Sequence, residues 1–152
     1  MVKVVKKKKS SSEIVKYFTE HHKLFSPPLE SRIDLKVFSQ KIYDNAIQFW
    51  AIDSCTQKNV GFMACYFNFP EKVYGYITTI SVVESMQGLG LGEELVKKAI
   101  ECGKERGFRS IRLEVNLQNI RAISFYRRLG FEKYDESDSS LFLRIDLEEN
   151  VL

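Results

Sequence analysis

The sequence has few residues of the kinds that bind metals or form disulfides. Its three cysteines are an odd number without paired spacing, which argues against a disulfide framework and against a zinc site. The two histidines, His21 and His22, are adjacent, and adjacent residues do not share a helix face. Because a cysteine nucleophile needs an activating base, we expect neither a metal site nor a cysteine–histidine catalytic pair.

Long apolar runs are also missing. No stretch approaches the roughly 20 apolar residues that cross a bilayer. The early lysines are followed by Ser10-Ser11-Ser12-Glu13, where a signal peptide would have an apolar segment. We therefore expect a cytoplasmic location and no membrane partner.

Positive charge is modest and local. The net charge is +3, and much of it comes from Lys3 and from Lys6 to Lys9. A short lysine run is typical of a solvated strand end. Nucleic-acid binding requires a basic stripe with a recognisable reading element, so no nucleic-acid partner is expected.

The 152 residues, of which 44% are hydrophobic, suit one domain with a real core. Ser10 with Glu13 resembles a capping box, and Asp34 can cap a second helix. Apolar periodicity and turn residues predict a mixed α/β domain covering 1–152. The predicted strands are 2–7, 47–52, 60–69, 74–82, 109–116, 131–134 and 141–147, and the predicted helices are 10–23, 34 onward, 91–106 and 119–129.

A glycine-rich loop, Gln87-Gly88-Leu89-Gly90-Leu91-Gly92, joins a β-branched strand to an amphipathic helix. Glycines allow backbone N–H groups to approach a ligand closely. The helix that follows adds free N–H groups and the positive end of its dipole. This arrangement predicts a pyrophosphate site.

Two common nucleotide motifs do not fit this loop. A dinucleotide fingerprint needs a third glycine, but the corresponding positions hold Glu93 or Leu95. A P-loop needs Lys and Ser or Thr after its last glycine, whereas Gly92 is followed by Glu93 and Glu94. The phosphate ligand is therefore of another kind.

Two motifs in order resemble those of the GNAT superfamily of N-acetyltransferases. The first is Gln87-x-x-Gly90-x-Gly92, and the second is the segment from Asn119 to Phe131. The resemblance covers about residues 77–134. It implies a mostly antiparallel mixed sheet of six to seven strands with about four helices, splayed between the strands at 74–82 and 109–116. It also implies acetyl-CoA as co-substrate, an amine as acceptor and, as is common in the family, a possible homodimer.

The resemblance assigns the cofactor-binding residues. The backbone amides from Gly88 through Leu89, Gly90, Leu91 and Gly92 to Glu93 would bind the pyrophosphate. The strand segment Ile80-Ser81-Val82 would offer backbone groups to the pantetheine arm and the thioester carbonyl, while the side chains of Ile80 and Val82 belong to the core. Asn119 matches a position that contacts CoA, although it also suits a simple helix cap.

Tyr126 matches the general acid of the family. A thiol with a pKa near 8.5 leaves as thiolate, and a phenol with a pKa near 10 can return a proton to it. Glu114 is the first candidate for the general base, because it lies twelve residues before Tyr126, as in the ribosomal-protein N-terminal acetyltransferase branch that this stretch resembles. Glu84 is a weaker candidate. Tyr74, Tyr76 and Thr78 are expected to share one strand face on the acceptor side.

Two functional readings remain open from the sequence. The first is an active enzyme that acetylates a primary amine of a small molecule or peptide. The second is a catalytically silent CoA-binding module of the same fold. The segment Pro27-Pro28-Leu29 and the helix after Asp34 are expected to border the acceptor pocket, but they carry no motif that identifies the acceptor.

Overall fold

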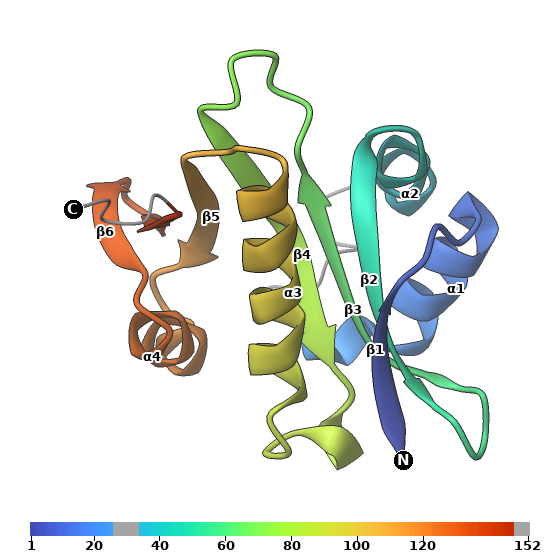
Figure 1. The fold of residues 1–152 in the computed structure, drawn as a ribbon. Helices are drawn as coiled ribbons and strands as arrows, with labels where there is room; N and C mark the ends of the chain where they lie inside the picture. The colour runs from blue at the N-terminus through green and yellow to red at the C-terminus, as the bar shows by residue number, and fades with distance from the viewer. Residues whose placement is uncertain (26–33, 148–152) are drawn as a thin grey trace.

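A seven-stranded sheet organises residues 1–25 and 34–147, the part of the chain that the computed structural model describes (Figure 1). The strand order is β1-β2-β3-β4-β5-β7-β6. The strands are β1 (Val2–Lys6), β2 (Ala46–Asp53), β3 (Asn59–Tyr66), β4 (Tyr74–Val82), β5 (Ser110–Asn116), β6 (Glu132–Glu136) and β7 (Ser140–Asp146). The helices are α1 (Ser11–Glu20), α2 (Leu35–Asn45), α3 (Leu91–Glu105) and α4 (Ile120–Arg128), with short 3-10 turns η1 (His22–Leu24) and η3 (Glu84–Met86). The predicted mixed α/β architecture is confirmed.

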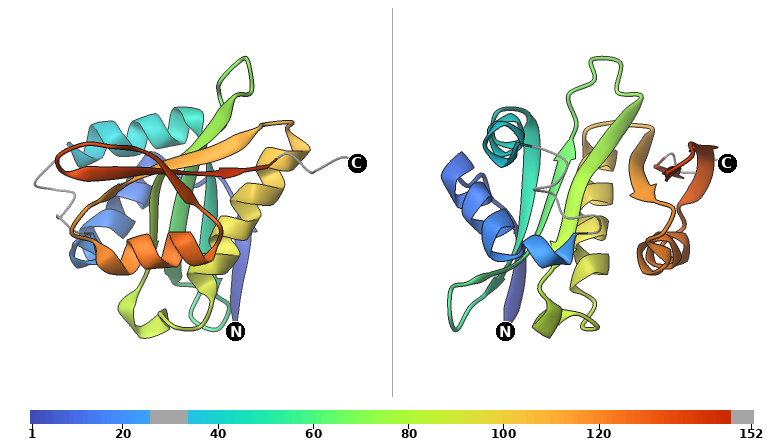
Figure 2. Two further views of the ribbon diagram at one scale, coloured as in Figure 1. Left: turned by 90° about the vertical axis from the view of Figure 1, so that its left-hand side faces the viewer. Right: turned by 180° about the vertical axis from the view of Figure 1, so that it is seen from behind.

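Helices cover the sheet on both faces (Figure 2). Alternate residues of β2 and β3 pack against the helices of opposite faces. Trp50, Phe62 and Ala64 pack with α1 and α2. Phe49 and Met63, one position along, pack with α3 and α4. Since neighbouring strand residues point to opposite faces, α1 and α2 lie on one face and α3 and α4 on the other.

The sheet is antiparallel except where β4 meets β5. That parallel pairing covers only Tyr74–Ile77 against Ser110–Leu113. Along its other edge β4 stays paired with β3 as far as Val82. The two central strands therefore separate after Ile77, which is the splay that the sequence predicted.

The helix starts follow the predicted caps. Ser10 caps α1 by accepting from the Glu13 amide at 3.2 Å, and Asp34 caps α2 by accepting from the Lys36 amide at 3.0 Å. The predicted end of the first helix at residue 23 is wrong, because α1 ends at Glu20 and the chain turns through η1. This turn allows Phe25 to pack edge-on against Phe18, with ring centroids 5.7 Å apart.

Most strand boundaries match the prediction within two residues, but β3 does not. It ends at Tyr66 instead of residue 69. Phe67 leaves the sheet and buries its ring against Phe108, with centroids 5.1 Å apart. Pro70 follows shortly after and has no backbone N–H to donate to a strand partner.

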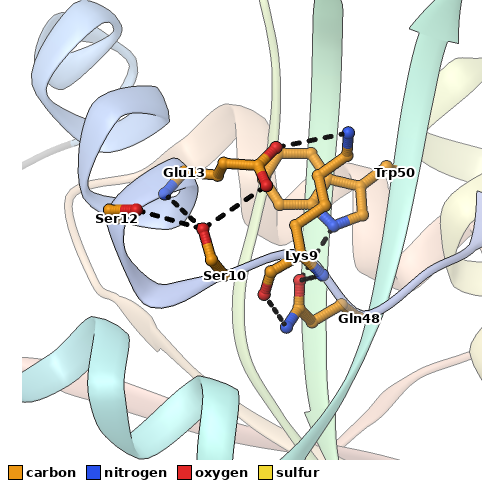
Figure 3. A network of polar contacts seen from close by, with 6 residues as sticks. All are labelled: Lys9, Ser10, Ser12, Glu13, Gln48 and Trp50. Atoms are coloured by element: carbon orange, nitrogen blue, oxygen red, sulfur yellow. Dashed lines mark hydrogen bonds and ion pairs between the residues drawn. The ribbon is translucent and has the colours of Figure 1, made fainter.

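A polar network joins the start of α1 to β2, next to the edge of the sheet (Figure 3). The Gln48 amide is buried, and its Oε1 accepts from the backbone of Lys9 at 3.0 Å and from Trp50 Nε1 at 2.9 Å. Its Nε2 donates to the Lys9 carbonyl at 3.0 Å. One glutamine therefore satisfies three polar groups that would otherwise be buried without partners.

Replacement of Gln48 by leucine is expected to destabilise the fold. The change leaves the Trp50 indole N–H and both backbone groups of Lys9 without their partner, so the free energy of unfolding should fall by about 2–4 kcal/mol. Urea unfolding measures this. The control is Gln40→Leu on the exposed face of α2, which should change stability by about 0.5 kcal/mol or less; equal effects would contradict the role assigned to Gln48.

Candidate active site

The divergence of β4 and β5 opens a cavity of about 280 Å³ through the sheet. Its walls come from both strands, from α4, and from the end of η1. The lining residues are Leu24, Phe25, Tyr76, Ile77, Thr78, Thr79, Ile80, Leu113, Glu114, Val115, Asn116, Asn119, Ala122, Tyr126 and Ser140. The cavity therefore connects the α1/α2 face of the sheet with the α3/α4 face.

β4 carries an extra residue at the mouth of this cleft. Ala64 lies opposite Thr79 but Cys65 lies opposite Ile77, so Thr78 has no partner on β3. Such a bulge reverses the side-chain phase of the strand. Ile77 is buried in the core under α3, whereas Ser81 is buried under α1.

The bulge corrects one expectation for this strand. The side chains of Tyr74 and Tyr76 lie on the α1/α2 face of the sheet. In the second half of the strand, Thr79 and Ser81 lie on that face instead. The predicted single face of Tyr74, Tyr76 and Thr78 is therefore interrupted. All the same, Thr78 lines the cavity together with Tyr76.

Past the bulge, the cleft-facing edge of β4 has no strand partner. Neither Thr78 nor any later residue of β4 pairs with β5. Backbone polar groups need partners, so this edge is suited to hydrogen bonds with an extended ligand. The Ile80-Ser81-Val82 segment predicted from the sequence lies on this edge; Ile80 and Val82 are half-buried and pack against the α3-side core, while Ser81 is buried.

Ser81 has a partner that sequence periodicity does not reveal. Its hydroxyl is 2.8 Å from the hydroxyl of Tyr17 on α1, 64 residues earlier. Burial raises the pKa of Tyr17 to about 12, although its hydrogen bond with Ser81 acts in the opposite direction. Tyr17 therefore fixes α1 to the strand that borders the cleft.

The glycine loop has the open geometry that a phosphate site requires. Gly88 and Gly90 both have φ of +82°, and a Cβ added at either position would meet no atom within 4 Å. Gly90 is also the N-cap of α3, which has no side-chain cap. The N–H groups of the first turn are thus left for a ligand at the positive end of the helix dipole.

Gln87 and Gly92 shape the loop from its two ends. The Gln87 side chain donates to the Val82 carbonyl at 2.9 Å, which ties the loop to the end of β4. A Cβ at Gly92 would lie 3.2 Å from the Phe125 ring of α4. Leu89 is exposed at the loop tip, and Leu91 is buried in the first turn of α3.

α4 brings Tyr126 and Asn119 to the cleft. Tyr126 is 7% exposed and lines the cavity next to Ala122, one helical turn earlier. Burial raises the pKa of Tyr126, so the phenol stays protonated at neutral pH. Asn119 accepts from the Ala122 amide at 3.2 Å and also lines the cavity, so it caps the helix while facing the cleft.

Glu114 reaches the same cavity from β5. Its carboxylate accepts a hydrogen bond from the hydroxyl of Ser140 on β7 at 2.7 Å. Ser140 is itself 6% exposed, so its direction is fixed by packing. No sequence pattern indicates Ser140, because this pairing depends on how β7 lies beside β5. Glu84, the weaker candidate base, is exposed in η3 and is not among the cavity residues.

The structure thus combines an uncapped, glycine-rich helix N-terminus, an unpaired strand edge, and a cleft lined by a tyrosine and a glutamate, an arrangement that suits an acyl-CoA-type transferase. The model of the acetyltransferase (GNAT) family matches residues 15–131. The chain therefore belongs to the GNAT family.

Similar sequences carry related names. An uncharacterised N-acetyltransferase of Methanocaldococcus jannaschii is 42% identical over 80 residues, which are 50% of this chain and 35% of that protein. The N-alpha-acetyltransferase MAK3 of Arabidopsis thaliana is 29% identical over 127 residues, 78% of this chain and 65% of that protein. The chain thus spans between about a third and two thirds of the length of these relatives.

Solved structures share the fold. An acetyltransferase of the GNAT family from Staphylococcus aureus superposes with a TM-score of 0.79 at 18% identity, over 97% of this chain and 100% of that one. A Bacillus anthracis protein described as a streptothricin acetyltransferase was solved in complex with acetyl coenzyme A. It has a TM-score of 0.59 and 26% identity over 67% of this chain and 62% of that one.

Substitution of Gly90 by alanine should weaken binding of coenzyme A. Positive φ strains an alanine by about 1 kcal/mol, and the added Cβ enters the space where a phosphate would approach. We expect the Kd to rise by about threefold to thirtyfold in calorimetry.

Gly107 provides a matched control for this experiment. Its φ is +78° at the far end of α3, and an added Cβ would meet only Lys72 at ordinary contact distance. Gly107→Ala should lower stability as much as Gly90→Ala does, yet leave the Kd unchanged. Equal Kd values in the two variants would show that the Gly90 effect is structural only.

Proposed function

We propose that this protein transfers the acetyl group of acetyl-CoA to a primary amine, with Glu114 as general base and Tyr126 as general acid. The observation that carries the proposal is the position of these two residues. Glu114 from β5 and Tyr126 from α4 line one cavity, at the point where β4 and β5 separate. A base and an acid on opposite sides of a bound thioester are what amide formation from an amine requires.

The donor would lie along β4. The amides at the start of α3 and around Gly88 and Gly90 would hold the pyrophosphate, and the unpaired edge from Thr78 to Val82 would hold the pantetheine arm. Acetyl-CoA supplies the activated acetyl group as a thioester. A backbone N–H of this edge directed at the thioester oxygen would stabilise the negative charge that develops during attack.

The acceptor would enter from the α1/α2 face. An alkyl ammonium has a pKa near 10.4, so it must lose a proton before it attacks. Ser140 donates to Oε2 of Glu114, which leaves Oε1 to take that proton directly or through one water. Because Glu114 is exposed, the proton can pass on to solvent.

The remaining steps form the amide and release the thiol. The amine nitrogen forms a bond to the carbonyl carbon, and the carbon–sulfur bond breaks with its electron pair on sulfur. Tyr126 then donates its phenolic proton to the thiolate. The tyrosine regains a proton as the new amide nitrogen loses its second one. Burial raises the pKa of Tyr126, so the phenol keeps its proton until a thiolate accepts it.

The acceptor class that we propose is a primary amine of a peptide or of a small molecule. The family membership supports amine acetylation, and the name of the Arabidopsis relative refers to an α-amine substrate of that protein. Leu24 and Phe25, which line the cavity beside Tyr76, would contact whatever follows the amine. The predicted border at Pro27-Pro28-Leu29 lies outside the described residues.

Removal of the Tyr126 hydroxyl should slow the chemical step. We expect Tyr126→Phe to lower kcat by about 10²–10³-fold with little change in the KM for acetyl-CoA, because the ring still fills its place. Thiol release in the presence of an amine measures both constants. Tyr43→Phe on α2, outside the cavity, is the matched control. An unchanged kcat in Tyr126→Phe would exclude this residue as the acid.

Replacement of Glu114 by glutamine tests the base. The amide keeps the size of the side chain but cannot accept the amine proton. We expect kcat/KM to fall and its pH profile to differ from that of the wild type, because this profile reports the acid and base of the free enzyme. A variant that keeps both the rate and the pH profile of the wild type would place the base elsewhere.

The same assays separate the enzyme from a catalytically silent module. Calorimetry reports the binding of acetyl-CoA, and thiol release against a broad panel of amines reports transfer. Binding together with amine-dependent thiol release supports the proposed function. Binding without release from any amine contradicts it and supports a silent CoA-binding module.

A further inference from the structure

A partly buried arginine lies between two tyrosine rings on the α1/α2 face of the sheet. The Arg112 guanidinium carbon is 4.2 Å from the centroid of the Tyr74 ring and 4.9 Å from that of Tyr134. Arg144, its register partner on β7, lies 5.7 Å from the same Tyr134 ring. Four strands, β4 to β7, thus bring two cations and two aromatic rings together.

The two arginines of this cluster form no ion pair within the described residues. Arg112 forms no ion pair there, and its Nε is buried without a hydrogen-bond partner. Arg144 likewise forms no ion pair, although Glu132 lies opposite it in register. A buried donor without a partner is unusual in folded proteins and needs a physical explanation.

Ring contacts alone do not explain this arrangement. Aromatic faces attract a guanidinium, but they do not cancel its charge or satisfy its N–H groups. Tyr76, the nearest other polar group on β4, does not cancel it either. Burial, with the nearby charge of Glu114, raises the pKa of Tyr76 to about 12, so its phenol is neutral at physiological pH.

The cluster adjoins the proposed acceptor site. Arg112 and Glu114 are two residues apart on β5 and therefore share one face, about 6.5–7 Å apart along the strand. Tyr76 is the register partner of Arg112 on β4 and lines the cavity. An acceptor with its amine at Glu114 would therefore extend past Tyr76 toward Arg112.

We propose that Arg112, assisted by Arg144, binds a carboxylate of the acceptor and so selects amines that carry an acidic group a few bonds from the reacting nitrogen. The inference rests on the proposed function, because Glu114 fixes where the amine lies. A guanidinium prefers a carboxylate, which it can bind through two parallel N–H groups. Such an acceptor could be a peptide with an acidic second residue or a free amino acid with a carboxylate side chain.

Two matched ligand pairs test the selection by binding, independently of turnover. The first is a tetrapeptide with glutamate or glutamine at position two, and the second is free glutamate or glutamine. Calorimetry with the CoA-bound protein should show one acidic member binding about tenfold to a hundredfold more tightly than its amide, and the difference should shrink at high salt. Which pair discriminates identifies the source of the carboxylate.

Variants then assign the preference to Arg112. Arg112→Gln should reduce the preference to about twofold or less, and Arg112→Lys, which keeps the charge, should retain part of it. Arg127→Gln makes the same change on the exposed surface of α4 and should leave the preference intact. Thermal unfolding shows whether each variant is folded, and Arg112→Lys provides the test if Arg112→Gln is not.

Equal affinities within both pairs, including no measurable binding of any member, would overturn the inference. A preference that survives in both Arg112 variants would overturn it too. The proposed function is judged separately, by thiol release from acetyl-CoA with neutral amines. Thiol release without a preference for acidic acceptors supports the proposed function and contradicts the anion site. A preference for acidic acceptors without any thiol release contradicts the proposed function and supports the anion site.

Discussion

The structure depends on the point at which β4 and β5 stop pairing. The two strands are hydrogen-bonded only as far as Ile77 and Leu113. Beyond them, β4 is held by β3 alone, and the bulge at Thr78 turns its side chains over. Because the strand edge past this point lacks a partner, the protein has a binding cleft in the middle of its sheet, where most sheets are closed.

The separation also gives the cleft two entrances with different chemistry. On one face, α4 lines it with the Tyr126 phenol, and the uncapped start of α3 lies beyond the end of the β4 edge. On the other, Glu114 lies on the same strand face as Arg112 of the tyrosine and arginine cluster. In the proposed function, the donor and the acceptor would therefore approach the reacting point from opposite faces of the sheet.

Features that depend on a few neighbouring residues were predicted from the sequence. The caps at Ser10 and Asp34, the glycine loop and the start of α3 follow from a few neighbouring residues each, and the structure confirms them. Tyr126 and Asn119 were predicted as site residues from a motif on one helix, and both line the cavity. The Tyr17–Ser81 and Glu114–Ser140 hydrogen bonds join residues 64 and 26 positions apart, so no periodicity could indicate them. The bulge at Thr78 was missed because buried and half-buried residues alternate along the whole of β4. Only the face of the sheet on which the buried side chains lie changes at the bulge.

Hydrogen exchange of the β4 amides tests this arrangement most directly. In the free protein, the cleft-facing amides from Thr78 to Val82 should exchange quickly, while those of Tyr74–Ile77 that are bonded to β5 exchange slowly. Acetyl-CoA should protect the first group and leave the second unchanged. No added protection between Thr78 and Val82 at saturating acetyl-CoA would contradict the proposed use of this edge as the donor site.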